Sequence, residues 1–161
     1  MIDFMVVSMP RSRSTWLANW LTTDKSICLH DPLRDKTIQD IEAMKADKVL
    51  GIADTSLLLY GDKLNRYQCK KLIIHRSLAQ VSRSVGEKID ARLADQLNGI
   101  KGLHIQYDEI NAMGQEIWQY LIGDGFDQER FDLLKDMNIE PHFPGLKRAS
   151  QNAIRRAAVF I

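Results

Sequence analysis

Residues 6–21 read VVSMPRSRSTWLANWL, and this stretch indicates the fold class. An apolar run ends in a short turn rich in Arg, Ser and Thr, and an apolar helical pattern begins directly after the turn. Residues 2–8 are expected to form a buried strand and residues 14–23 a helix, with Trp16 and Trp20 on one face. The polar turn therefore lies between the carboxyl end of a strand and the amino end of a helix.

The rest of the chain continues this alternation of strands and helices. Three further short strands are expected at residues 49–53, 71–75 and 102–107. Helices are expected at residues 36–46, 78–85, 89–97, 109–122, 129–137 and 152–160. This order predicts an α/β fold of three layers, with a mostly parallel central sheet of about four to five strands flanked by helices. No repeat or linker divides the 161 residues, so we expect a single domain spanning 1–161.

Composition excludes several classes of partner. Hydrophobic residues make up 45% of the chain and charged residues 27%, and the net charge is +1. This balance gives no reason to expect general binding to nucleic acid or to anionic membranes. No apolar run approaches the roughly twenty residues that span a bilayer, and the first residues lack the basic region of a signal peptide. We therefore expect a cytoplasmic protein.

The turn has the composition of an anion site. The amino end of a helix carries unpaired N–H groups and partial positive charge, which favour a phosphate or sulfate group. Ser12, Ser14 and Thr15 add hydroxyl donors, and Arg11 and Arg13 add guanidinium groups that bind such anions bidentately. The alternative is that Ser14 only caps the helix and both arginines are solvated.

The identity of the anion follows from a family resemblance. The Walker pattern GxxxxGK[ST] is absent, which disfavours ATP and GTP. Residues 10–16, PRSRSTW, resemble the phosphosulfate-binding loop P-[KR]-S-G-[ST]-T-W of sulfotransferases that use 3′-phosphoadenosine 5′-phosphosulfate (PAPS). Arg13 replaces the usual glycine. The resemblance implies a P-loop-type fold, PAPS as donor, 3′-phosphoadenosine 5′-phosphate (PAP) as product, and no metal. The implied donor-binding residues of the loop are Arg11, Ser12, Arg13, Ser14, Thr15 and Trp16.

Trp16 has two interpretations. The resemblance implies that its ring packs on the adenine, whereas its helical spacing from Trp20 is equally consistent with the core.

A second motif lies at residues 70–85, KKLIIHRSLAQVSRSV. In the family, an Arg at the end of a strand and a Ser eight residues later hold the 3′-phosphate, and Arg76 and Ser84 have this spacing. Ser77 is a candidate helix start, so Ser84 returns to the same helix face two turns later. The alternative is a surface Ser and a salt-bridged Arg. A third resemblance, at GLHIQYDEI and YLIGDGFDQERFDLL, concerns the scaffold.

Sulfuryl transfer requires charge neutralisation at the leaving oxygen and a base for the acceptor. The resemblance places Arg11 against the bridging oxygen, where its guanidinium acts electrostatically. Asp31, in the segment CLHDPL, is the first choice of base, His30 the second and Asp54 the third. For each of these residues, a cap or turn role is the competing interpretation.

The predicted function is transfer of a sulfuryl group from PAPS to a hydroxyl or amine of an acceptor that the sequence does not identify. One alternative is a P-loop nucleotide or small-molecule kinase. The other is a non-catalytic PAP- or nucleotide-binding protein. In the family, a basic segment near the C-terminus also contacts the 3′-phosphate, and the candidates are Lys147 and Arg148, or Arg155 and Arg156. For these residues a solvated basic helix face is the favoured interpretation.

Overall fold

The computed structural model describes residues 1–44 and 47–137. Five strands form one parallel sheet in the order β2-β3-β1-β4-β5. Their bounds are Phe4–Ser8 (β1), Ser26–His30 (β2), Val49–Ala53 (β3), Lys70–His75 (β4) and Leu103–Gln106 (β5). The predicted fold class, α/β with a parallel sheet flanked by helices, is confirmed.

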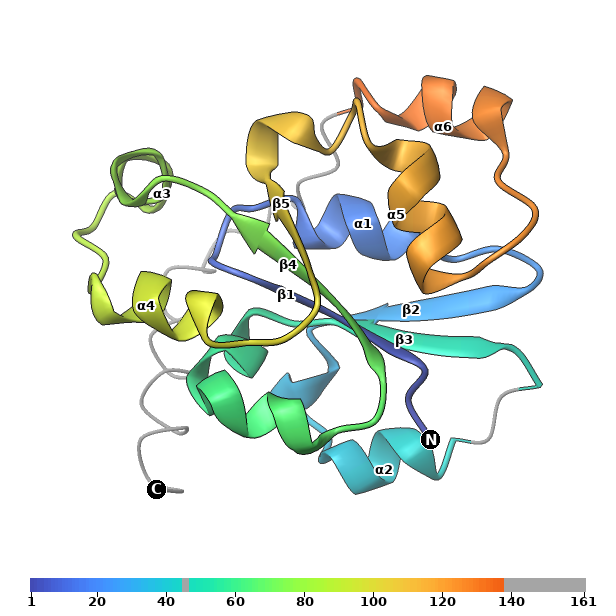
Figure 1. Ribbon diagram of the computed structural model, residues 1–161, viewed down its shortest axis with the longest axis horizontal. Coiled ribbons are helices and arrows are strands. Elements are labelled where there is room, and N and C mark those ends of the chain that lie inside the picture. The colour runs from blue at the N-terminus through green and yellow to red at the C-terminus, as the bar shows by residue number, and fades with distance from the viewer. Residues whose placement is uncertain (45–46, 138–161) are drawn as a thin grey trace.

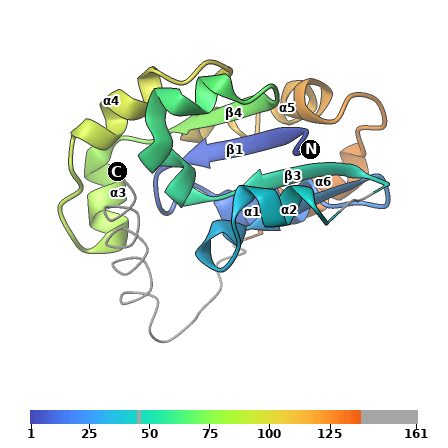
Figure 2. The ribbon, with the colours of Figure 1, turned by 90° about the horizontal axis from the view of Figure 1, so that it is seen from below.

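Helices cover both faces of the sheet (Figure 1). The helices are α1 (Ser14–Trp20), α2 (Ile38–Glu42), α3 (Leu78–Val85), α4 (Arg92–Asn98), α5 (Gly114–Leu121) and α6 (Gln128–Leu134). Within the described residues there are also three 3-10 segments, η1 (Pro32–Arg34), η2 (Thr55–Arg66) and η3 (Tyr107–Glu109). One apolar cluster packs α1, α5 and α6 on one face, and a second packs α2, η2 and α4 on the other. In Figure 1 the strands run between these two layers, and Figure 2 views the sheet from the side of α2 and η2.

The central strand, β1, is buried throughout and packs closely against β3. All five residues of β1 are buried, as expected for a strand with neighbours on both sides and helices on both faces. Phe4 lies beside Gly51 of β3 in the parallel register. A Cβ atom at Gly51 would overlap the Phe4 ring, so the glycine leaves the space that this ring fills. The close approach fixes β1 against β3.

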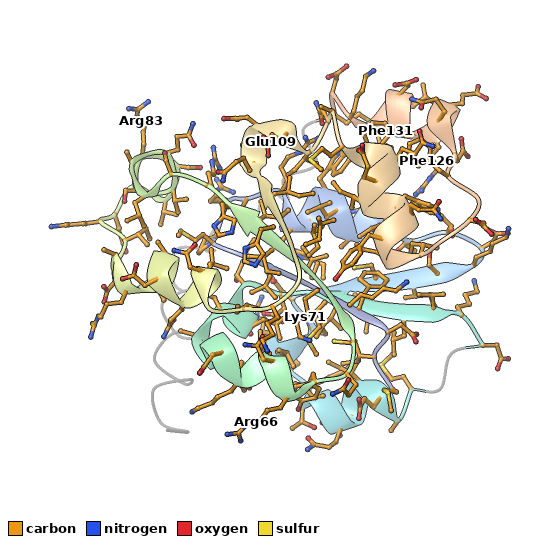
Figure 3. All side chains as sticks on the ribbon, viewed as in Figure 1. Arg66, Lys71, Arg83, Glu109, Phe126 and Phe131 are labelled. Atoms are coloured by element: carbon orange, nitrogen blue, oxygen red, sulfur yellow. The ribbon has the colours of Figure 1, made fainter. Side chains whose placement is uncertain are left out.

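Helix α6 is attached to α1 by aromatic packing and by an arginine. Phe126 and Phe131 lie side by side at α6 (Figure 3), with their ring centroids 5.6 Å apart. The Phe131 centroid lies 5.1 Å from that of Trp20 in α1. The Arg130 guanidinium donates to three carbonyl oxygens at the end of α1, those of Asn19, Trp20 and Thr22. These bonds satisfy backbone acceptors that a helix end leaves without intrahelical partners.

Three elements differ from the sequence-based expectation. Residues 26–30 form an edge strand, β2, where we expected only a segment after the first helix. Residues 55–66 form η2, which is interrupted at Gly61 by a φ of 51°. The helix expected over 109–122 begins only at Gly114. The helix expected at 152–160 lies outside the described residues.

Candidate functional site

The turn between β1 and α1, residues 9–13, lies at the carboxyl edge of the sheet and is here named the β1–α1 turn. Arg11 and Arg13 both have a φ of 64°, the left-handed conformation that glycine favours. Ser12 between them is fully buried, and its Oγ has no hydrogen-bond partner. Ser8, at the end of β1, is also buried with an unpaired Oγ. Buried hydroxyls normally have partners, so two unpaired ones beside this turn indicate a place for a polar ligand.

Arg76, from the motif at residues 70–85, contacts the motif at residues 10–16. It follows β4, and its Nη1 donates to the carbonyl oxygen of Arg11 in the β1–α1 turn. Its guanidinium also stacks on Tyr107, with Cζ 4.1 Å from the ring centroid. The Nε atom is buried without a partner. The structure thus places Arg76 against the turn, although the two motifs are 65 residues apart.

Arg13 points away from the turn towards α6. Its Nη1 donates to Asn111 Oδ1 and its Nη2 to the carbonyl oxygen of Lys135, both at 2.6 Å. Burial lowers the pKa of this guanidinium, while the Tyr107 hydroxyl and Asp136 act in the opposite direction. Arg13 occupies the N-cap position of α1 without a side-chain capping bond. Its side chain therefore links α1 to the end of α6.

Trp16 is a core residue in this structure. It is 2% exposed, and its ring centroid lies 5.3 Å from that of Trp20. Its Nε1 donates to the carbonyl oxygen of Leu134 at 2.6 Å. The Arg13 guanidinium covers the ring, with Cζ 4.0 Å from the centroid. Trp16 and Arg13 thus both attach the first turn of α1 to the end of α6.

His30 connects the carboxyl end of β2 to the first turn of α1. Its Nε2 lies 3.3 Å from Ser14 Oγ and 3.0 Å from Thr15 Oγ1. Ser14 therefore does not cap the helix, which was the alternative interpretation of its hydroxyl. The same Nε2 lies 3.6 Å from Asp31 Oδ2. The His30 imidazole therefore lies between the Ser14 and Thr15 hydroxyls of α1 and the carboxyl group of Asp31.

Asp31 lies in an unusual environment. Its φ of 47° is left-handed, and its Oδ1 is buried without a partner. Burial raises the pKa of this carboxyl; His30 lowers it and Asp54 raises it further. A buried carboxyl oxygen with no partner is costly for the fold, which is typical of a group that serves a ligand.

Asp54 is engaged in the scaffold. It is 3% exposed, its Oδ2 accepts from the backbone N–H of Leu33, and its Oδ1 accepts from the backbone N–H and hydroxyl of Ser56. These bonds cap η2 and hold the turn after β2. With both oxygens occupied, Asp54 is poorly placed to accept a proton from a substrate.

Ser84 is less closely associated with the site. It is exposed in the last turn of α3, next to Arg83, which points outwards in Figure 3. Among the described residues, no hydrogen bond joins Ser84 to Arg76. Lys147, Arg148, Arg155 and Arg156 lie outside the described residues.

The sequence did not reveal Tyr107, Asn111 or Ser8 as members of this site. The Tyr107 ring stacks under the Arg76 guanidinium and lies near Arg13. Asn111 accepts a hydrogen bond from Arg13 through its Oδ1. Both follow β5, at the same edge of the sheet as the β1–α1 turn, and this shared edge was the available signal. Ser8 was the last residue of a predicted strand, which placed it at that edge as well.

A comparison with solved structures identifies the fold. A crystal structure of mouse sulfotransferase SULT7A1 complexed with PAP superposes with a TM-score of 0.52 at 13% sequence identity, covering 97% of this chain and 83% of that chain. The chain has a sulfotransferase-like fold. No protein-family model matches the chain, and no curated protein matches its sequence.

The described residues lack two further features. None of their helices is long and apolar enough to span a bilayer. No group of three or more His, Cys, Asp or Glu side chains within residues 1–44 and 47–137 is arranged to hold a metal ion.

Proposed function

We propose that this protein transfers a sulfuryl group from PAPS to a hydroxyl or amine acceptor. The observation that carries the proposal is the contact between the two anion motifs, in which Arg76 donates to the carbonyl oxygen of Arg11. Two short segments that resemble the phosphosulfate loop and the 3′-phosphate motif of one family thus meet at one edge of the sheet. The fold of the mouse sulfotransferase supports the same assignment.

In this proposal the donor lies across the β1–α1 turn. The unpaired Ser12 hydroxyl and the hydroxyls of Ser14 and Thr15 donate to the phosphosulfate. Arg11, exposed at the same turn, neutralises the charge that develops on the leaving 5′-phosphate oxygen. Arg76 provides positive charge for the 3′-phosphate.

The chemical step forms a bond from the acceptor oxygen or nitrogen to sulfur and breaks the bond from sulfur to the 5′-phosphate oxygen, which keeps the electron pair. We propose His30 as the base for the acceptor proton: its Nε2 lies against the Ser14 and Thr15 hydroxyls, and when these hydroxyls turn to donate to the phosphosulfate, the Nε2 lone pair is left to accept the acceptor proton. This reverses the order of preference for Asp31 and His30 that was expected from the motif CLHDPL. Asp31, 3.6 Å away, stabilises the positive charge that His30 acquires.

The proposal is tested by calorimetric titration with PAP, ADP and ATP plus Mg²⁺. PAP should bind more tightly than ADP because only PAP carries a 3′-phosphate. Arg76→Ala should weaken PAP binding by about 1.5–3 kcal/mol, the value of a charge-assisted hydrogen bond, and leave ADP binding nearly unchanged. Equal affinity of the unmodified protein for PAP and ADP would contradict the proposal, and a preference for ATP with Mg²⁺ would favour a kinase.

A further inference from the structure

A cleft lies at the amino edge of the sheet, opposite the edge that holds the β1–α1 turn. It has a volume of about 550 Å³ and is formed where β1, β4 and β5 begin, beside the end of η2. Among the described residues that line it, three are basic, Lys70, Lys71 and Lys101, and one, Asp3, is acidic. The Asp3 carboxylate accepts a hydrogen bond from the backbone N–H of Leu50. The lining therefore carries a net positive charge.

Lys71 is the buried lysine of the cleft. It is 5% exposed, and Figure 3 shows it within the fold, whereas Arg66 at the end of η2 points outwards. Its Nζ donates to the carbonyl oxygens of Tyr67 at 2.7 Å and Cys69 at 3.1 Å. An ammonium group has three N–H donors, so these bonds leave one donor for a further acceptor.

The charge of Lys71 has no counter-charge in the described part of the chain. None of the ion pairs between described residues includes its Nζ. The two carbonyl oxygens that it contacts are dipoles without formal charge. A buried charge is costly unless an opposite charge accompanies it. An anion in the cleft would supply both the third acceptor and the counter-charge.

The rim of the cleft is held in place by close packing and by hydrogen bonds. A Cβ atom at Gly102 would overlap the carbonyl oxygen of Lys71, so only glycine lets the chain before β5 pass this close to β4. The Asn65 side chain accepts from the backbone N–H of Lys101 at 2.7 Å and donates to the carbonyl oxygen of Gly99 at 2.9 Å. These bonds fix the connection between α4 and β5. The exposed Lys101 ammonium makes no hydrogen bond with the described residues, and it is available to a ligand.

We propose that this cleft binds a phosphate dianion, either free phosphate or the phosphate group of a monoester. Lys71 supplies a buried N–H donor, and Lys70 and Lys101 supply charge at the rim. Lysine ammonium groups bind phosphate as compact point charges, and more than one is needed to match the charge of a dianion. The cleft and the β1–α1 turn lie at opposite edges of the sheet, so this site is independent of the proposed function.

The test is a titration of the full chain with inorganic phosphate, followed by NMR of the ¹⁵N-labelled backbone at about pH 7.5, where phosphate is mainly a dianion. Sodium chloride at equal ionic strength is the reference for general screening. We expect the amide signals of Gln68, Lys101 and Gly102 to shift in a saturable way, with a dissociation constant of about 1 mM or lower. A parallel titration with phenyl phosphate distinguishes the sources. Tighter binding than inorganic phosphate assigns a monoester, and equal or weaker binding assigns free phosphate.

Two outcomes of the titration would overturn the proposal. The first is that chloride produces the same shifts as phosphate at the cleft. The second is that the shifts are confined to Ser12 and its neighbours in the β1–α1 turn, which would place the anion in the donor site alone and leave the proposed function intact.

A pair of charge reversals isolates the cleft. Lys101→Glu should weaken phosphate binding about tenfold or more, because it replaces an attractive charge in the lining by a repulsive one. Lys63→Glu is the matched control, since it changes the net charge equally at an exposed position of η2 outside the lining, and it should leave the dissociation constant within about twofold. Lys71→Met should abolish saturable binding. The Lys101 variant decides the question even where Lys71→Met does not fold, and equal effects of the two Glu variants would overturn the proposal.

Discussion

Arg13→Ala is expected to destabilise the fold measurably. The substitution removes two guanidinium hydrogen bonds of 2.6 Å and the stacking on Trp16 at 4.0 Å. A hydrogen bond to a charged group contributes about 1.5–3 kcal/mol when buried, and a cation–π contact about 0.5–1 kcal/mol. Because Arg13 is only half-buried, we reduce each hydrogen bond to about 1 kcal/mol. The free energy of unfolding should fall by about 2–3 kcal/mol.

Arg13→Gly separates the side chain from the backbone. At a φ of 64°, a residue with a Cβ atom is strained and glycine is not. Allowing for the greater entropy of glycine in the unfolded chain, Arg13→Gly should be more stable than Arg13→Ala by about 0.5–1 kcal/mol. The exposed Arg92, which pairs with Asp90, provides a control, and its change to Ala should stay within about 0.5 kcal/mol of the unmodified protein.

The assay is urea unfolding followed by the fluorescence of the buried tryptophans. Equal midpoints for Arg13→Ala and the unmodified protein would show that the contacts with Asn111 and Lys135 add no stability. A lower midpoint for Arg13→Gly than for Arg13→Ala would show that the left-handed backbone is not strained, and would refute the reasoning for this position.

Two further predictions concern the carboxyl edge of the sheet. The pKa of Asp31 is raised in the folded protein, so ionisation of this carboxyl opposes folding. At pH 7, Asp31→Asn should therefore raise the free energy of unfolding by about 0.5–1 kcal/mol, a value reduced because the side chain is 41% exposed. The gain should disappear as the pH falls below about 4, where Asp31 is protonated in both states, and a gain that persists there in urea unfolding would contradict the electrostatic cause. His30→Gln should lower the turnover of PAPS about a hundredfold or more and leave PAP affinity within about threefold, whereas Asp31→Asn should reduce turnover less. If single-turnover measurements show a larger loss for Asp31→Asn than for His30→Gln, the base is Asp31.

The central strands and most helices could be predicted from the sequence because their apolar patterns are local. β2 was missed because its five residues, SICLH, mix Ser and His with apolar side chains at the edge of the sheet. η2 was missed because the kink at Gly61 interrupts its pattern. Patterns of this kind depend on neighbours that only the folded chain provides.

The composition of the candidate site was predictable, but the direction of its side chains was not. The run of Arg, Ser and Thr predicted an anion site, and the position of Arg76 after a predicted parallel strand predicted that it lies at the same edge of the sheet. That Arg13 turns away depends on Asn111 and Lys135, which are 98 and 122 residues distant in the chain. The local sequence around Arg13 does not encode contacts with such distant residues. It therefore could not predict whether the Arg13 side chain points into the turn or away from it.

The close approach of Phe4 and Gly51 has a consequence for the evolution of this protein. Any side chain at position 51 would overlap the Phe4 ring, so position 51 cannot change alone, whereas a smaller residue at position 4 alone would leave a cavity and destabilise the fold. A larger residue at 51 requires a smaller one at 4, and the two substitutions must arise together or through a destabilised intermediate. In distant relatives, the two positions should therefore vary as a pair. A larger residue at one position should accompany a smaller residue at the other, so that their combined volume between the neighbouring strands stays about the same.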